Sequence, residues 1–339
     1  TKFFGSIELV ADTPEDIAIR NLAISDGATL AQRSNTLDRG TRTLYEDFTQ
    51  RVDDITTEIN TLTEQVRQIN LQITSAEGGG SSGSYAGALR SQRNLALQQL
   101  AEITNIKVTE QESGAVNVAV NGDLLVFEGT RRAVKTETIN ENGLTRTVVQ
   151  FADNSSDLAA TGGELHGIYE ARDTVIGGFI ENLDEFAATL VFEFNKLYSQ
   201  GEGIAGFQSL TTVERVSDPS AALNDAGLNF TPVSGVLQFN VHNTEIDNPD
   251  ARTEQHDIFI DLNGSDGDTT LNSLAASINA IDGVSASVNF NNELVITADS
   301  DAIQFSFSGD TSGALAALGL NTFFTGSKAR DIGVNEVLQ

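Results

Sequence analysis

The chain lacks cysteine, methionine and tryptophan altogether among its 339 residues. Without cysteine it can form neither a disulfide framework nor a thiolate metal site, so only histidines and carboxylates could hold a transition metal. Positive charge is also scarce: 20 Lys and Arg stand against 48 Asp and Glu, for a formal net charge of −28. Such a surface repels the phosphates of nucleic acids and of anionic lipids, so the composition argues against both as partners.

Long apolar runs are missing as well. No stretch is long enough to cross a membrane, and none has the pattern of a cleavable signal peptide. The first residue is threonine rather than methionine, so we expect a processed product or a piece of a longer protein. With 39% hydrophobic residues, including 18 Phe, the chain has the composition of a folded protein rather than of a disordered one.

One stretch has a strict heptad pattern. Its apolar residues follow one another at alternating steps of three and four, which is the a/d spacing of a coiled coil. They are Val52, Ile55, Ile59, Leu62, Val66, Ile69 and Ile73. We call this set the heptad seam, and it predicts a long amphipathic helix with one narrow apolar edge.

The flanking residues predict the limits of this helix. Thr13 is the expected N-cap and Pro14 the first helical residue, and the pattern reaches about Ser75. Gly27 and Gly40 are candidate positions for a bend or an interruption, because glycine costs a helix about 1 kcal/mol relative to alanine.

A glycine- and serine-rich turn at 78–84 is expected to reverse the chain into a second helix, forming an antiparallel hairpin. Alternating valines at 116, 118 and 120 and turn signals at 113–114, 121–122 and 142–143 then predict a small β insertion. A return helix follows, and we expect the heptad seam to pack on it. Its predicted stripe is Ile168, Val175, Phe179, Leu183, Phe186, Leu190, Phe194 and Leu197, widened by Ile176, Ile180 and Val191.

The segment after Gly206 reads mainly as β structure. Strands are predicted at 235–243 and 256–264, and a helix with Leu271, Leu274, Ala275 and Ile278 on its apolar face precedes two further strands. A short helix capped by Asp310 or Thr311 comes next. The predicted fold is therefore α+β, an elongated multidomain chain in which β-rich domains are inserted into a long antiparallel helical rod.

No catalytic, cofactor-binding or metal site is predicted. His242, Glu245, Asp247, His256 and Asp257 are close in sequence, but a solvated acidic loop is the favoured reading because no ligand motif is present. The segment 261–268 resembles a calcium loop but has no glycine at its sixth position and no carboxylate at its twelfth. The segment 309–313 fits a helix start better than a nucleophile turn. We therefore expect no enzymatic activity.

Four stretches together resemble the flagellar hook-associated protein family that forms the hook–filament junction of bacterial flagella. The segments 162–176 with 183–201 look like its return helix, and 318–335 looks like its re-entry from the outer β domain. The segments 60–73 with 89–122 look like its helical hairpin, whereas 273–300 is similar to a unit shared more widely with flagellins and filament caps. The family's Arg-Asp pair appears here as Arg93-Asn94, to which we assign no function.

The resemblance implies a structural, self-assembling subunit of the flagellum that is exported by the flagellar type III apparatus and works outside the cell in motility. It implies assembly into a ring, with the hook protein and a second hook-associated protein or flagellin as neighbours. It also implies terminal coiled-coil segments that are absent here, one of which would bind an export chaperone, so the chain alone should be a monomer. The expected parts are a first rod segment (1–106), a small β insertion (107–163), the return helix (164–202), an outer β-rich domain (203–326) with its flagellin/hook-type unit (269–298), and the re-entry (327–339).

Three alternatives are kept at this stage. One is another flagellar axial protein, namely a filament cap or a flagellin. The second is a secreted surface adhesin whose outer β domain binds a carbohydrate. The third is a metal-dependent hydrolase at His242 and His256, for which a stoichiometric metal would be required.

Overall fold

The computed structural model describes residues 2–78, 83–141, 143–203, 205–248, 252–265 and 267–338. It contains long helices and several antiparallel sheets, so the predicted α+β class is confirmed. The chain divides into two compact units, one formed by Arg39–Glu181 and the other by Thr1–Asp38 with Asn182–Gln339. We call them the 39–181 unit and the split unit.

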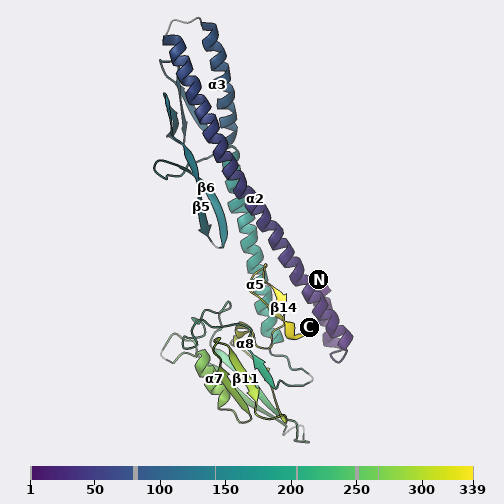
Figure 1. The fold of residues 1–339 in the computed structure, drawn as a ribbon. Helices are drawn as coiled ribbons and strands as arrows, with labels where there is room; N and C mark the ends of the chain where they lie inside the picture. Colours follow the sequence, from purple (N-terminus) through teal and green to yellow (C-terminus); the bar gives the residue numbers. More distant parts are fainter. Residues whose placement is uncertain are drawn as a thin grey trace. The chain divides into compact units, whose positions relative to one another are not determined.

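Helix α2 (Ile17–Gly78) contains the heptad seam. All seven seam residues are buried, as predicted, and Val52, Ile55, Ile59, Val66 and Ile73 are fully enclosed. Helix α3 (Gly83–Ile103) lies beside the end of α2 (Figure 1), although residues 79–82 of the predicted turn lie outside the described residues.

The β part of the 39–181 unit lies against this helix pair. Strands β1 (Ile106–Glu110), β2 (Val116–Val120), β3 (Asp123–Phe127) and β4 (Thr130–Arg131) form one antiparallel sheet in that order. Strands β5 (Val134–Glu141) and β6 (Leu144–Phe151) form a separate hairpin. Alternate residues of β2 are buried, which confirms the predicted inward valines.

The return segment is not a single α-helix. Helix α4 (Gly163–Tyr169) is followed by a π-helix, η1 (Glu170–Gly177), and then by α5 (Gly178–Tyr198). The seam residues from Val52 to Val66 share a core with α3, the strands and the two α4 residues Leu165 and Ile168, whereas Ile69 and Ile73 pack with Leu89 of α3. The prediction that the seam packs on the return helix is therefore confirmed at Ile168 and wrong for the later members of the predicted stripe, which are absent from this cluster.

The predicted apolar face of the return segment, over η1 and α5, was also partly wrong. Ile176, Ile180 and Val191 are buried as expected, but four members of the predicted stripe are exposed. These are Val175, Phe179, Phe186 and Leu197. The cause is the π-helix: its wider turns change the angular position of every residue that follows, so a 3.6-residue period does not carry through it.

The N-terminal end of the split unit also differs from prediction. A short helix, α1 (Lys2–Asp12), precedes α2 and was not predicted. The carboxylate of Asp16 accepts hydrogen bonds from the backbone N–H groups of Ala18 and Ile19 at 2.8 and 3.3 Å, so Asp16 caps α2. The Thr13 hydroxyl instead donates to the Leu9 carbonyl at the end of α1, and the predicted Thr13 cap was wrong.

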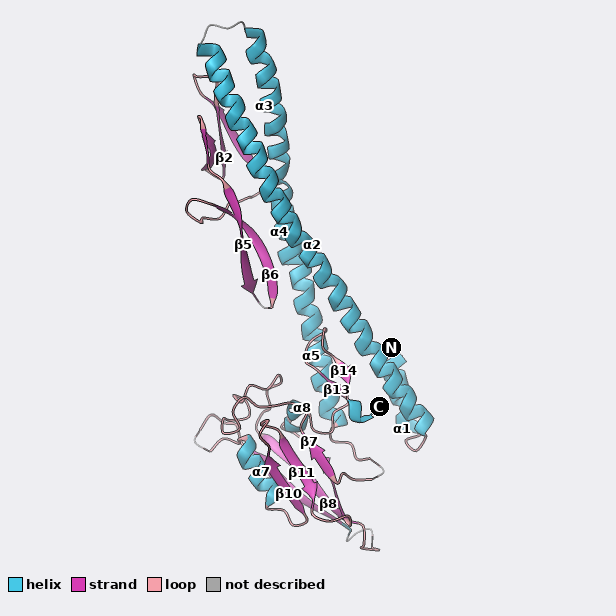
Figure 2. Ribbon diagram, viewed as in Figure 1, coloured by secondary structure: helices cyan, strands magenta, loops and turns pink. Residues whose placement is uncertain are grey.

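The remaining elements of the split unit are two packed sheets and short helices (Figure 2). One sheet has the order β10 (Val284–Val288), β11 (Leu294–Ala298), β7 (Ser209–Thr211); the other has the order β12 (Ile303–Ser308), β8 (Gly235–Asn243), β9 (Thr253–Ile260). Helix α7 (Leu271–Asn279) buries its four predicted apolar residues in the same core as both sheets. Helix α8 (Ala314–Leu318), strands β13 (Phe324–Thr325) and β14 (Gly333–Val334), and the 3₁₀ turn η2 (Glu336–Leu338) complete the unit.

The re-entry segment packs on the helices of the split unit. Phe323, Phe324 and Ile332 share a cluster with Phe3 of α1 and Val191 of α5. The Ala329 backbone is held from both sides, because its carbonyl accepts from the Asn35 amide at 2.9 Å and its N–H donates to the Asp184 carboxylate at 3.0 Å.

Candidate functional site

The two histidines considered above as ligands of a metal site, His242 and His256, make separate local contacts. His242 Nε2 lies 2.8 Å from the Ser306 hydroxyl and 2.9 Å from a Glu202 carboxylate oxygen. His256 lies 3.6 Å from the carboxylate of Glu254. Across the described ranges, no three histidines or carboxylates are grouped so that they could hold a metal ion.

The two other segments considered for chemistry are turns stabilised by their own side chains. The Asp268 carboxylate accepts from the backbone N–H groups of Asn263 and Gly264. The Asp310 carboxylate accepts from the N–H groups of Gly313 and Leu315 at the start of α8, but the N-cap residue is Gly313 rather than the predicted Asp310 or Thr311. Residue 266 of the first segment lies outside the described residues.

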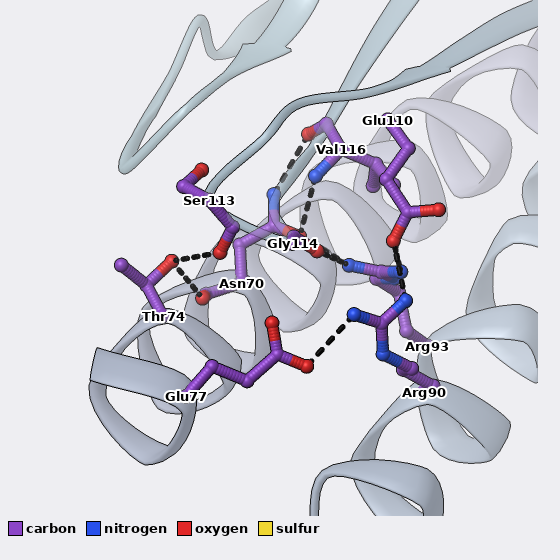
Figure 3. Close-up of polar contacts among 9 residues, drawn as sticks. All are labelled: Asn70, Thr74, Glu77, Arg90, Arg93, Glu110, Ser113, Gly114 and Val116. Atoms are coloured by element: carbon purple, nitrogen blue, oxygen red, sulfur yellow. Dashed lines mark hydrogen bonds and ion pairs between the residues drawn. The ribbon is translucent and has the colours of Figure 1, made fainter. Parts of the chain in front are cut away.

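The most elaborate polar cluster surrounds Arg93, a residue to which sequence reasoning gave no role. Its guanidinium lies between α2, α3 and the turn that joins β1 to β2 (Figure 3). It donates to the Gly114 carbonyl at 2.7 Å and to Asn70 Oδ1 at 3.2 Å, and it lies 3.4 Å from the Glu110 carboxylate. Arg93 is only 3% exposed, and among the described residues its Nε has no hydrogen-bond partner.

Arg90 forms the solvent-exposed side of this cluster. Its guanidinium joins the carboxylates of Glu77 on α2 and Glu110 on β1, at 2.8 and 2.5 Å (Figure 3). Burial is the main cause that lowers the pKa of Arg93, and the neighbouring Glu110 opposes that shift. Arg90 and Arg93, one turn apart on α3, thus both contact the Glu110 carboxylate on β1. We call this arrangement the Arg93 clamp, because it joins α3 to β1.

Two asparagines of α2 attach the strands to the helix by the same geometry. Asn70 accepts from the Val116 N–H at 3.1 Å and donates to its carbonyl at 2.8 Å. Asn60 makes the same pair of bonds with Val134, at 3.0 and 2.7 Å. Each amide therefore satisfies both backbone groups of one strand residue, which fixes β2 and β5 on the helix.

A second buried arginine lies in the π-helix. Arg172 is fully enclosed; it pairs with both carboxylate oxygens of Asp173, at 2.7 and 3.0 Å, and donates to the Thr147 carbonyl at 2.8 Å. The rings of Tyr45 and Tyr169 lie 5.8 and 5.3 Å from its guanidinium. This cluster connects α2, β6 and η1 within the 39–181 unit.

The split unit has an open apolar groove along α5 and α1. It has a volume of about 360 Å³, and its lining includes Phe4, Phe186, Leu190, Glu193, Phe194 and Leu197. Phe186 and Leu197 are 60% and 78% exposed. The groove therefore leaves apolar side chains of α1 and α5 in contact with solvent.

Sequence signals for the two buried arginines existed. Arg93 follows Leu89 by four residues and precedes Leu97 by four, so it occupies an apolar position of its helix. Arg172 stands midway between Ile168 and Ile176 in the same way. Polar residues at apolar positions of a helical stripe predict buried hydrogen-bonding clusters.

Comparison with known proteins gave consistent matches. The family model described as "Flagellar hook-associated protein FlgK helical domain" matches residues 1–209, and the model of the flagellin hook IN motif matches residues 237–300. Flagellar hook-associated protein 1 of Escherichia coli K12 is 23% identical over 337 residues, covering 96% of this chain and 54% of that protein. The Salmonella typhimurium protein of the same name is 23% identical over 206 residues, covering 59% of this chain and 37% of its own length.

A solved structure shows the same fold. The flagellar hook junction protein FlgK from Burkholderia pseudomallei superposes with a TM-score of 0.53 at 17% identity, covering 95% of this chain and 59% of that one. The present chain thus spans about half the length of the relatives that it matches over most of its residues. No helix in the described residues is long and apolar enough to cross a membrane.

Proposed function

Because the chain belongs to the flagellar hook-associated protein FlgK family, we propose that it is a structural subunit of the bacterial flagellum, acting as an adaptor between hook and filament. The observation that carries the proposal is the helical-domain match, which covers more than half of the chain. The chain is proposed to have no enzymatic role.

The proposed mechanism is mechanical. The segments 1–106 and 164–202 form a helical rod that packs beside the rods of neighbouring copies, and 327–339 returns the chain to it. The small β insertion (107–163) and the outer domain (203–326) lie at the surface of the ring, where they contact adjacent subunits. The Arg93 clamp and the paired bonds of Asn60 and Asn70 support this proposal, because they hold strands to helix without relying on apolar burial alone.

The proposed partners follow from an adaptor's position. Other copies of the chain form the ring, the hook protein contacts one side, and a second hook-associated protein or flagellin contacts the other. The protein is proposed to reach the cell exterior through the flagellar type III apparatus, escorted by an export chaperone. Neither nucleic acid nor membrane is a proposed partner, which agrees with the net charge of −28.

The alternatives are not favoured. A flagellin or filament cap would account for the hook IN motif at 237–300 but not for the hook-associated helical domain at 1–209. A carbohydrate-binding adhesin would likewise leave the helical match unexplained, and it predicts retention of the chain on a glycan array.

The test is electron microscopy of flagella from a strain that lacks the gene. The expected result is hooks without attached filaments, with flagellin released into the medium, and restoration by the intact gene. Normal filaments in the deletion strain would refute the junction role. Normal hooks and normal junctions with a missing cap would instead identify a filament-cap protein.

A further inference from the structure

The turn between β10 and β11 presents an aromatic side chain to solvent. Phe290 in this turn is 95% exposed, more than any other large apolar side chain in the described residues. Burying a phenylalanine side chain is worth about 1.5–3 kcal/mol, so a ring held entirely in water is an available source of binding energy.

Hydrogen bonds fix this turn. Asn289 Oδ1 accepts from the N–H groups of Asn291 and Glu293 at 2.8 and 3.0 Å. The Asn292 amide donates to the Val216 carbonyl at 3.1 Å, and the Val216 N–H donates back to the Asn292 carbonyl at 3.3 Å. The backbone that carries Phe290 is therefore already ordered. Binding through this ring would cost less backbone entropy than binding through a mobile loop.

A positive charge lies beside the same turn. Arg215 precedes Val216 and is 70% exposed, and its Nε lies 3.3 Å from the carboxylate of Glu293. We call Phe290 with Arg215 the knob. Arginine has five N–H donors, so this exposed guanidinium can bind a second carboxylate while keeping the first.

The groove on α5 and α1 has complementary features. Aromatic and aliphatic side chains line it together with Glu193, whose carboxylate is 60% exposed and pairs with Lys196 at 3.2 Å, so a second cation would share this carboxylate with Lys196. Its volume of about 360 Å³ lies within the range of pockets that take small aromatic ligands.

We propose that the knob of one copy inserts into the groove of a second copy, with Phe290 against Phe186 and Leu197 and Arg215 facing Glu193. Copies with a net charge of −28 repel each other, so attraction must come from apolar contact and from the few exposed cations. Knob and groove are different surfaces, so the contact is heterologous, and repetition of such a contact builds rings or helical arrays rather than closed dimers.

This inference deepens the proposed function by naming one contact between subunits, but its test does not need flagella. A contact of this size is weak between two free chains and becomes effective when an array makes it many times. The chain alone is then mostly monomeric, while copies meet transiently in one orientation.

Cysteine cross-linking tests the orientation, since the chain has no cysteine of its own. An Asn291→Cys chain, which keeps Phe290, is mixed with a Thr189→Cys chain of different mass, which keeps Phe186 and Leu197. Asn291 is exposed beside Phe290, and Thr189 is exposed in the lining of the groove. Under mild oxidation, mixed disulfides are quantified on a non-reducing gel. The matched control is Phe259→Cys, because Phe259 is also largely exposed, at 74%, but lies on β9 away from the turn. All three substitutions are at exposed side chains and should leave the fold intact.

The expected result is mixed disulfide that forms at least several-fold faster with Asn291→Cys than with Phe259→Cys. Equal rates, or no mixed product at high chain concentration, would overturn the knob-and-groove contact. Either failure would leave the junction role standing, because that role is tested by the deletion strain.

A charge exchange tests the pairing of Arg215 with Glu193. Arg215→Glu in the Asn291→Cys chain should slow the cross-link several-fold, and Glu193→Arg in the Thr189→Cys chain should restore it. Restoration of the cross-linking rate requires residue 215 of one copy to face residue 193 of the other. If Glu193→Arg fails to rescue, or speeds the control pair equally, this pairing is wrong.

Discussion

At the scale of single residues, Arg93 shows why a charged side chain can belong to a core. Its carbonyl and amide partners come from the β1–β2 turn and from α2, so one guanidinium ties three elements together. Removing it leaves the Gly114 carbonyl and the Asn70 amide enclosed with one partner fewer.

We expect Arg93→Ala to lower the free energy of unfolding by about 1–3 kcal/mol, because the buried Gly114 carbonyl loses its hydrogen bond and a buried acceptor left unpaired costs about that much. Arg90→Ala is the control, since Arg90 is 37% exposed and exposed ion pairs contribute about 0–1 kcal/mol. Urea denaturation followed by circular dichroism measures both. Equal losses in the two variants would show that the clamp does not depend on the buried arginine.

The lowered pKa of Glu64 predicts that the stability of the fold depends on pH. Hydrogen bonds from Arg67, and then from Gln68, lower the pKa of the Glu64 carboxyl from 4.5 to about 2. Because the folded-state pKa lies below the unfolded one, the stabilisation is present above about pH 4.5 and is lost as the pH falls towards 2. Glu64 is accessible to solvent, which screens its charge, so the loss of stability is smaller than the full pKa shift would give.

Glu64→Gln should therefore flatten the dependence of the urea midpoint on pH between 4.5 and 2. Glu58→Gln removes the same charge from the same helix and is the matched control. A slope that Glu64→Gln leaves unchanged, relative to that control, would count against the ion pair with Arg67.

At the scale of elements, the two glycines of α2 behave oppositely. The helix continues through both, so neither candidate position interrupts it. A Cβ added at Gly27 would lie 2.6 Å from a ring carbon of the buried Phe323, whereas one added at Gly40 would meet nothing within 4 Å. Gly27 is thus required by packing and Gly40 is not.

We expect Gly40→Ala to raise the unfolding free energy by about 1 kcal/mol, through helix propensity alone. Gly27→Ala should instead lower it by about 1–2 kcal/mol, since overpacking costs about 1–3 kcal/mol and outweighs the propensity gain. Thermal unfolding of the two variants should move in opposite directions. A shift of the same sign in both would contradict the close approach of Phe323.

Periodicity predicted elements well where one period applies throughout. The heptad seam and the α7 face are buried as expected because each lies in an uninterrupted α-helix. The face of α5 could not be predicted, because a pattern analysed at one helical period does not reveal that the preceding segment Glu170–Gly177 is a π-helix with wider turns. The Arg93 cluster was missed for a related reason: its partners come from three segments, and a single-helix pattern shows only one of them.

At the scale of the whole molecule, the 39–181 unit is continuous in sequence and has its own core. That core joins α2, α3, the strands and α4. We expect an isolated fragment of residues 39–181 to fold, giving a cooperative urea transition and a mixed helix–strand spectrum. Leu165→Asp in the fragment should abolish the transition, because Leu165 is fully buried and a lone charge cannot be accommodated there. A fragment without a cooperative transition would show that the unit depends on the rest of the chain.

The aromatic cluster around Phe323 has a practical consequence for watching the molecule unfold. In a chain without tryptophan, ultraviolet emission comes from tyrosine, and of the four tyrosines only Tyr198 belongs to the split unit. Its ring packs 5.4 Å from that of Phe323. A Tyr198→Phe chain would therefore have no tyrosine in the split unit. Its remaining tyrosine fluorescence would report the unfolding of residues 39–181 alone.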